Sequence, residues 1–142
     1  MLDMLIQGGR VVTPAGVGNW DVGIIGEQIV AVAFPGILPG IAKQVIDASG
    51  KIVVPGGIET HAHAVANVQP GARALVSGVP NAGPLEHSLG AIWGGTTTVV
   101  DFAPVPTEGD LAQGIHNYLT PWQGNAYTDY STHCIYTSNN PP

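Results

Sequence analysis

Strand and helix patterns alternate along residues 56–137, and this alternation constrains the fold more than any other feature of the sequence. The runs GIETHAH (57–63), TTTVVDFA (96–103) and AYTDYSTHCIYT (126–137) are typical of strands. Between them lie PLEHSLGAIWGG (84–95) and TEGDLAQGIHNYLTPW (107–122), which carry apolar residues at helical spacing. Strands separated by helices favour a parallel sheet with right-handed crossovers. We therefore predict an α/β fold in which residues 56–142 have the rhythm of the first three β/α units of a TIM-type (β/α)8 barrel. A whole barrel takes about 250 residues, so this would be an incomplete one within something larger, or else a different and smaller α/β arrangement.

The two helical segments carry specific signals. Pro84 suits the first turn of a helix, and the spacing places Leu85, Leu89, Ile92 and Trp93 on one apolar face. In the second segment Thr107 and Asp110 resemble a capping box, and Pro121 should end the helix.

Residues 1–55 have no helical periodicity and read as short strands joined by glycine turns. Gly26-Glu27 between two β-branched runs predicts a two-residue hairpin. Gly8-Gly9 and Ala48-Ser49-Gly50 predict two further turns between apolar strands. We assign residues 1–55 to the N-terminal part of a β-sandwich-like composite domain, followed by the barrel portion at 56–142.

The composition limits the classes of function. Charged residues are only 10% of the chain, against roughly 25% in a typical soluble domain, so we expect further polypeptide or a partner subunit to cover part of it. The net charge of −6 and four scattered basic residues argue against nucleic acid. The sequence shows neither a secretory signal nor an apolar run of about 18 residues, which argues against a membrane protein. With Cys134 as the only cysteine, a cytoplasmic protein is expected.

Two histidines one residue apart, His61 and His63, end the first predicted strand after Pro-Gly-Gly. Alternate residues of a strand share one face, so the two imidazoles and Glu59 are expected to point the same way. Two imidazoles at a strand end can bind Zn²⁺ or a similar ion, although an H-x-H pair also occurs by chance. The residues that follow, 64–68, do not fit metallo-β-lactamase-like proteins or cupins. A barrel phosphoesterase remains an alternative.

Four segments in this order closely resemble the amidohydrolase superfamily: LIQGGRVVTPAG, IDASGKIVVPGGIETHAH, IWGGTTTVVDFA and DYSTHCIYT. Within it, the chain is similar to the N-terminal portion of the cyclic-amidase branch, the dihydropyrimidinases and D-hydantoinases, from about residue 5 to residue 137. The resemblance implies a hydrolase that opens the C–N bond of a cyclic amide or ureide, such as a hydantoin or dihydropyrimidine ring, by metal-activated hydroxide. It also implies a divalent metal, usually zinc and binuclear in the complete enzyme, and a homo-oligomer for the full-length form.

The resemblance assigns roles residue by residue. His61 and His63 would be metal ligands, and Glu59 would support the site without touching the metal. Apart from the resemblance, Asp101 follows a buried strand, where it could orient a site residue from behind or serve as a cap or turn residue. Glu59 departs from the aspartate usual in this branch. The loop after the histidines, with Val65, Val68 and Leu75, would shape the substrate mouth. The bridging lysine, the later histidines and the proton-shuttling aspartate of the family have no counterpart here, so no catalytic residue is assigned and this chain alone is expected to be inactive.

Two other readings of the sequence stay open. The chain could be a non-catalytic product that packs on a full-length partner. It could also be a small independent α/β domain in which His61 and His63 are core residues. Among the other histidines, His133 is expected to be packed or hydrogen-bonded, and His87 and His116 to be solvated.

Overall fold

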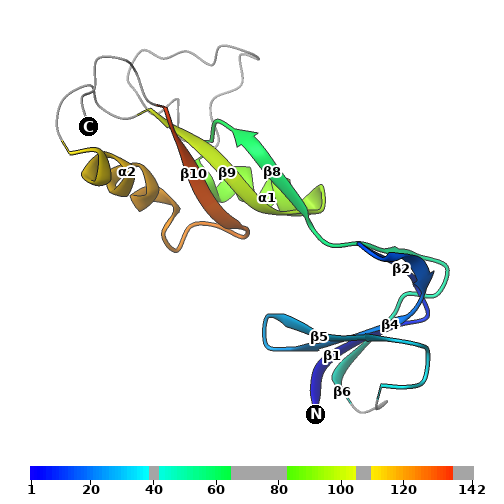
Figure 1. The fold of residues 1–142 in the computed structure, drawn as a ribbon. Helices are drawn as coiled ribbons and strands as arrows, with labels where there is room; N and C mark the ends of the chain where they lie inside the picture. The colour runs from blue at the N-terminus through cyan, green and yellow to red at the C-terminus, as the bar shows by residue number, and fades with distance from the viewer. Residues whose placement is uncertain (39–41, 65–82, 105–109, 136–142) are drawn as a thin grey trace. The chain divides into compact units, whose positions relative to one another are not determined.

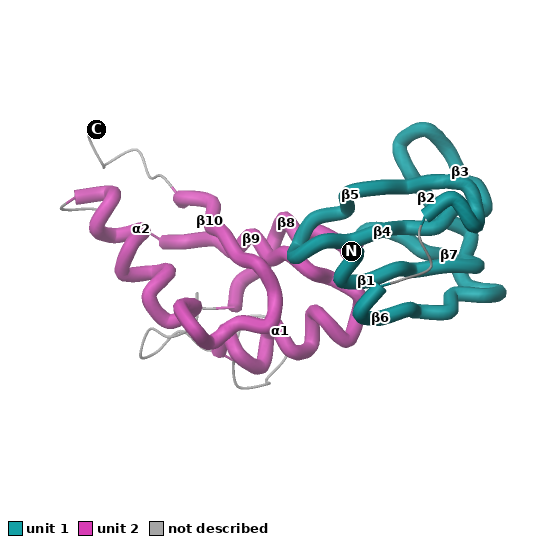
Figure 2. The backbone as a smooth tube through the Cα atoms, turned by 90° about the horizontal axis from the view of Figure 1, so that it is seen from below, with its two compact units in different colours: residues 1–55 teal, residues 56–142 magenta. Residues whose placement is uncertain are grey.

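The computed structural model describes residues 1–38, 42–64, 83–104 and 110–135, which form a mixed α/β structure with three sheets (Figure 1). The chain separates into two compact units, Met1–Pro55 and Gly56–Pro142 (Figure 2). Among the residues described, the first unit contains strands and no helix, and the second contains a parallel sheet with its helices. Within the described residues, neither helix is both long and apolar enough to cross a membrane.

The first unit holds two sheets. Four strands make one sheet in the order β5 (Gln28–Ala33), β4 (Asp21–Ile25), β1 (Leu2–Gln7) and β6 (Ala42–Asp47). Three strands make the other in the order β3 (Gly16–Asn19), β2 (Arg10–Thr13) and β7 (Ile52–Val53). The predicted hairpin at Gly26-Glu27 is confirmed, because Ile25 of β4 pairs with Gln28 of β5 and Gly26 has a φ of 58°.

The other two glycine turns do not join paired strands. β1 and β2 flank Gly8-Gly9 but lie in different sheets, as do β6 and β7 on either side of Ala48-Ser49-Gly50. Instead, β1 pairs in parallel with β6, and β2 pairs in parallel with β7. Two extended segments therefore run side by side and change sheet together. Gly8 and Gly50, with φ of 78° and 73°, take the left-handed backbone conformation that this change requires.

The second unit has the strand and helix order that the sequence predicts. Its elements are β8 (Gly57–Ala62), α1 (Pro84–Trp93), β9 (Thr96–Pro104), α2 (Leu111–Leu119), the short 3₁₀ turn η1 (Thr120–Trp122) and β10 (Asp129–Ile135). The three strands lie in the order β10-β9-β8, and both pairings are parallel. The predicted parallel sheet is therefore confirmed for these three strands.

The two faces of this sheet differ in burial. Along β9, Val99, Asp101 and Ala103 are completely buried, whereas the alternating Thr98, Val100 and Phe102 are only partly so. The buried face packs against Trp122 of η1, whose side chain is fully enclosed, and against Ala91 of α1 and Tyr118 and Leu119 of α2. We call the opposite face of β8, β9 and β10, which carries Phe102, the open face.

The apolar face that the sequence indicates for helix α1 is not the side that is buried. Its one buried residue is Ser88, whose Oγ accepts from the backbone N–H of Tyr127 at 3.0 Å and donates to the carbonyl of Leu85 at 3.1 Å. The large apolar residues are turned away from the sheet: Leu85, Leu89, Ile92 and Trp93 are all exposed. The small side chain of Ser88 allows a direct contact between the helix and the segment before β10.

Helix α2 begins later than the capping box predicts. The N-cap is Asp110, whose carboxylate accepts from the backbone N–H of Ala112 at 2.8 Å. Thr107 lies outside the described residues. Pro121 does follow the end of α2, within η1.

Trp122 and Trp93 allow a matched test of this packing. Trp122→Ala should lower the free energy of unfolding by about 3–5 kcal/mol, because it empties the centre of the second unit's core. Trp93 is 84% exposed, so Trp93→Ala should change stability by no more than about 0.5 kcal/mol. Urea unfolding followed by far-ultraviolet circular dichroism measures both. Equal losses in the two variants would contradict the assigned core.

Candidate functional site

His61 and His63 lie where β8 ends, on the open face. Their neighbours Ala62 and Ala64 are 6% and 3% exposed and belong to the core on the helix side, while both histidines are exposed. The two imidazole centroids are 5.3 Å apart in an edge-to-face arrangement. The histidines thus leave the strand in a common direction, which is incompatible with the reading in which both are core residues.

A β-bulge sets this direction. Glu59 is paired with Val99 and Ala62 with Asp101, so two residues of β8, Thr60 and His61, stand opposite one residue of β9. Such an extra residue shifts the strand's alternation by one position. Beyond the bulge His61 and His63 share the side of Phe102, whereas Glu59 before it shares the side of the buried Val99.

Glu59 therefore lies on the other face, which corrects the expectation that it points the same way as the histidines. It lines a cavity on the helix side of the sheet together with Glu86, His87 and Ala91 of α1. His87 is half-buried there rather than solvated, with its ring 6.4 Å from that of Trp122. His116 of α2 is exposed, as expected.

Side chains hold the peptide group at the bulge from both ends. The Glu59 carboxylate accepts from the backbone N–H of His61 at 2.8 Å. The carbonyl of Thr60, which belongs to the same planar peptide unit, lies 3.2 Å from Nε2 of His133 on β10. A carbonyl only accepts, so the His133 imidazole donates. The prediction that His133 is packed or hydrogen-bonded is confirmed.

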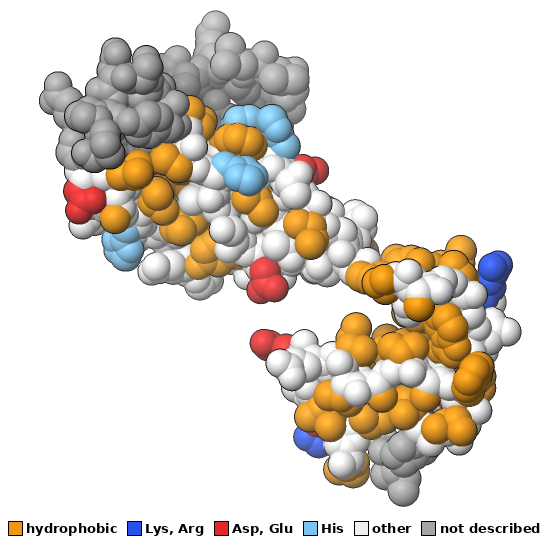
Figure 3. Space-filling model, viewed as in Figure 1, with side chains coloured by type: hydrophobic (Ala, Val, Ile, Leu, Met, Phe, Trp, Pro, Cys, Tyr) orange, Lys and Arg blue, Asp and Glu red, His pale blue; other side chains and the backbone are white. Residues whose placement is uncertain are grey.

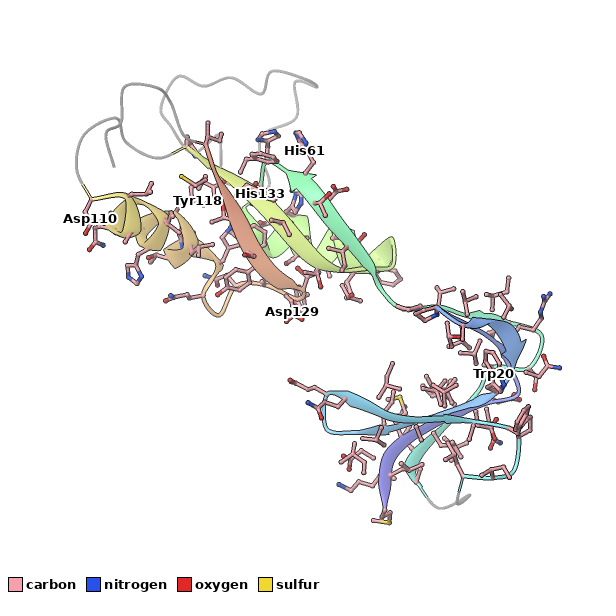
Figure 4. The ribbon with its side chains drawn as sticks, in the orientation of Figure 1. Trp20, His61, Asp110, Tyr118, Asp129 and His133 are labelled. Carbon is pink, nitrogen blue, oxygen red and sulfur yellow. The ribbon has the colours of Figure 1, made fainter. Side chains whose placement is uncertain are left out.

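Phe102 is the centre of the histidine group. Its ring centroid lies 4.5 Å from that of His61, 5.4 Å from that of His63 and 4.9 Å from that of His133. Figure 3 shows histidine side chains around hydrophobic atoms on this face of the second unit, and Figure 4 shows His61 and His133 toward the same end of the sheet. The phenyl ring gives three imidazoles from two strands a common apolar support.

Asp101 fixes the chain just past the pair. Its carboxylate is fully buried, and Oδ1 accepts from the backbone N–H groups of Ala64, at 3.1 Å, and Phe102, at 2.9 Å. Oδ2 accepts from the hydroxyl of Tyr118 on α2 at 2.8 Å. A buried carboxylate requires such donors, because it has lost its hydration. Asp101 thus bonds to the backbone of the residue directly after His63.

The separation of the two imidazole centroids is similar to that of two imidazoles bound to one tetrahedral ion. With Zn–N bonds of 2.0–2.1 Å, two imidazoles on one such ion have ring centroids roughly 5 Å apart, close to the distance observed. The described part of the chain contains no group of three or more histidine, cysteine, aspartate or glutamate side chains that could hold a metal. Val65, Val68 and Leu75, expected at the substrate mouth, lie outside the described residues.

Sequence reasoning overlooked Phe102 and Tyr118. Strand alternation in TTTVVDFA places Phe102 opposite Asp101, but only the pairing of β9 with β8 and β10 shows that histidines surround it. Tyr118 stands at a position of α2 that no local pattern singles out, and 17 residues separate it from Asp101.

Comparison with known proteins relates the whole described structure to two kinds of enzyme. The D-hydantoinase of Streptomyces coelicolor is 33% identical over 96% of this chain, and that of Ralstonia pickettii is 32% identical over 94%. The crystal structure of dihydropyrimidinase from Brevibacillus agri superposes over 94% of the chain with a TM-score of 0.80 at 31% identity. The chain spans only 28%, 27% and 27% of these proteins, respectively. No family model matches the chain.

The support that Phe102 gives to the histidines can be tested by NMR. Phe102→Ala should remove the ring-current displacement of the His61, His63 and His133 ring protons and lower stability by about 1–2 kcal/mol, since the side chain is half-buried. Phe34, the only other phenylalanine, is 71% exposed and lies in the first unit, so Phe34→Ala is the control. Unchanged histidine shifts in Phe102→Ala would contradict the cluster.

Proposed function

This chain is homologous to the D-hydantoinases and dihydropyrimidinases and corresponds to an N-terminal portion of that cyclic amidohydrolase branch, and we propose that it contributes the first part of a metal-dependent ring-opening hydrolase. The observation that carries the proposal is the H-x-H pair, whose imidazoles share the open face at the end of a parallel strand. The substrate would be a cyclic amide or ureide, hydrolysed at a ring C–N bond.

The same proposal gives each unit a place in the complete fold. Residues 1–55 would form part of a β-sandwich-like domain, and residues 56–142 would supply the first three β/α units of a (β/α)8 barrel. The parallel order β10-β9-β8 with intervening helices supports the barrel assignment. The open face would then become the barrel interior, and the end of β8 would lie at the C-terminal mouth where barrel enzymes place their sites.

In this proposal His61 and His63 bind one divalent ion, with zinc as the expected metal. Such an ion, when bound, supplies activation of water and polarisation of the substrate carbonyl. The chain's own part is to hold the two imidazoles at a fixed separation. Glu59, His133 and Asp101 do this through the backbone, and Phe102 does it through ring contacts. The loop with Val65, Val68 and Leu75 would face the ring substituent.

A non-catalytic role is the second candidate. It is favoured by the lack, within the described ranges, of a third ligand beside His61 and His63. In that case the chain would pack on a full-length partner or bind a metal weakly. Assembly of the full-length form into homo-oligomers stays a prediction.

The two imidazoles should bind a metal ion without the rest of the family's ligands, but weakly. We expect Co²⁺ added to this chain to broaden and shift the His61 and His63 ring resonances in a saturable way. His61→Ala and His63→Ala should each lower the Co²⁺ affinity by at least roughly 10- to 100-fold, because that is the loss seen when only a residue supporting a metal ligand is removed. His116→Ala, at an exposed position of α2, should leave it unchanged.

Ring opening separates the two candidate roles. This chain alone should not hydrolyse dihydrouracil or hydantoin, because its described residues offer only His61 and His63 as neighbouring ligands. A product that continues through the family's later strands should do so and lose the activity in His61→Ala. Turnover that survives that substitution would refute the ligand assignment, and an inactive longer product would favour the non-catalytic role.

A further inference from the structure

Two backbone peptide groups bracket the H-x-H pair, and side chains from other strands bond to both. The group between Thr60 and His61 is bonded by Glu59 and by His133, both of which have exposed side chains. The group between His63 and Ala64 is bonded by Asp101, which is fully buried. Because a peptide group is planar, fixing the Ala64 N–H also fixes the carbonyl end of His63.

Burial makes the Asp101 contact the stiffer of the two. Ala64 is 3% exposed and Asp101 is not exposed at all, so water cannot replace this hydrogen bond without opening the core. Hydrogen bonds to a charged group out of water are among the stronger ones. The Asp101 contact is a buried anchor for the backbone directly after the pair.

Asp101 in turn receives its orientation from helix α2. Tyr118 packs against the core of the second unit, and its hydroxyl donates to Oδ2 at 2.8 Å while Oδ1 accepts from Ala64. The two oxygens of one carboxylate therefore join α2 to the backbone after His63. Tyr118 can therefore influence the two imidazoles through Asp101 and the Ala64 amide.

We propose that Tyr118 and Asp101 act as a positioning pair. Through this pair the position of α2 on the sheet determines the backbone conformation at His63, and with it the geometry of the two imidazoles. The inference rests on the proposed function only in naming these imidazoles as ligands. If Asp101 only capped the end of the strand, removing the Tyr118 hydroxyl would not change the backbone at Ala64 or the position of the His63 ring. If the two residues act as a positioning pair, removing that hydroxyl should change both.

Tyr118→Phe is the direct test, because it deletes the hydroxyl and keeps the ring in the core. Amide exchange at Ala64 should become roughly two- to tenfold faster, the effect of losing one net hydrogen bond, and the His63 ring resonances should shift. The affinity for Co²⁺ should fall about tenfold, which is the lower end of the roughly 10- to 100-fold loss seen when a residue that supports a metal ligand is substituted. Tyr127→Phe is the matched control, since that side chain is 60% exposed in the same unit.

Asp101→Asn is the second variant, with exchange at Val11 in the first unit as an internal reference. It should accelerate exchange at Ala64 at least as much as Tyr118→Phe, and the double variant should add little to either change, as expected for one coupled pair. The inference would be overturned if Tyr118→Phe left the amide exchange rate at Ala64 and the His63 ring resonances as in the wild type. It would also be overturned if Tyr127→Phe changed them equally. A wild-type chain that binds no Co²⁺ would refute the metal assignment alone, and the exchange measurement would still decide on the positioning pair.

Discussion

The irregular pairing of β8 with β9 is the constraint on which the candidate site depends. One extra residue between the Glu59–Val99 and Ala62–Asp101 pairs turns His61 and His63 to the open face and Ala62 and Ala64 into the core. In a regular strand the same alternation would have placed Glu59 beside the histidines. The bulge interrupts the ladder between the strands, and the polar groups it leaves are bonded by Glu59 and His133.

The residues around the histidines divide into two kinds of support. On the open face the contacts are ring against ring, with Phe102 between three imidazoles. On the buried face the contact is a carboxylate held by α2 and bonded to the backbone. The first keeps the rings together, and the second keeps the chain that carries them in place. Both come from β9, in the adjacent residues Asp101 and Phe102, whose side chains point to opposite faces.

The low content of charged residues has a structural counterpart. Large apolar side chains are exposed on both units, among them Phe34 and Ile29 in the first and Ile58 and Trp93 in the second. The chain spans little more than a quarter of the D-hydantoinases and dihydropyrimidinases that it matches. In the proposed barrel, the open face beside Ile58 would be interior surface. Coverage of these side chains by further polypeptide or a partner stays a prediction.

The sequence by itself determined the alternation of strands and helices, the parallel sheet, the hairpin at Gly26 and the homology carried by the segments around His61 and His63. These depend on local periodicity, turn chemistry and motif order, which a linear reading contains. Only the tertiary structure decided that β1 and β2 part into different sheets, that α1 packs through Ser88 rather than its apolar stripe, and that Glu59 faces away from the histidines. Each of these follows from the pairing of segments distant in the chain. A shift of one residue in such pairing reverses a side chain's face, and no local pattern encodes it.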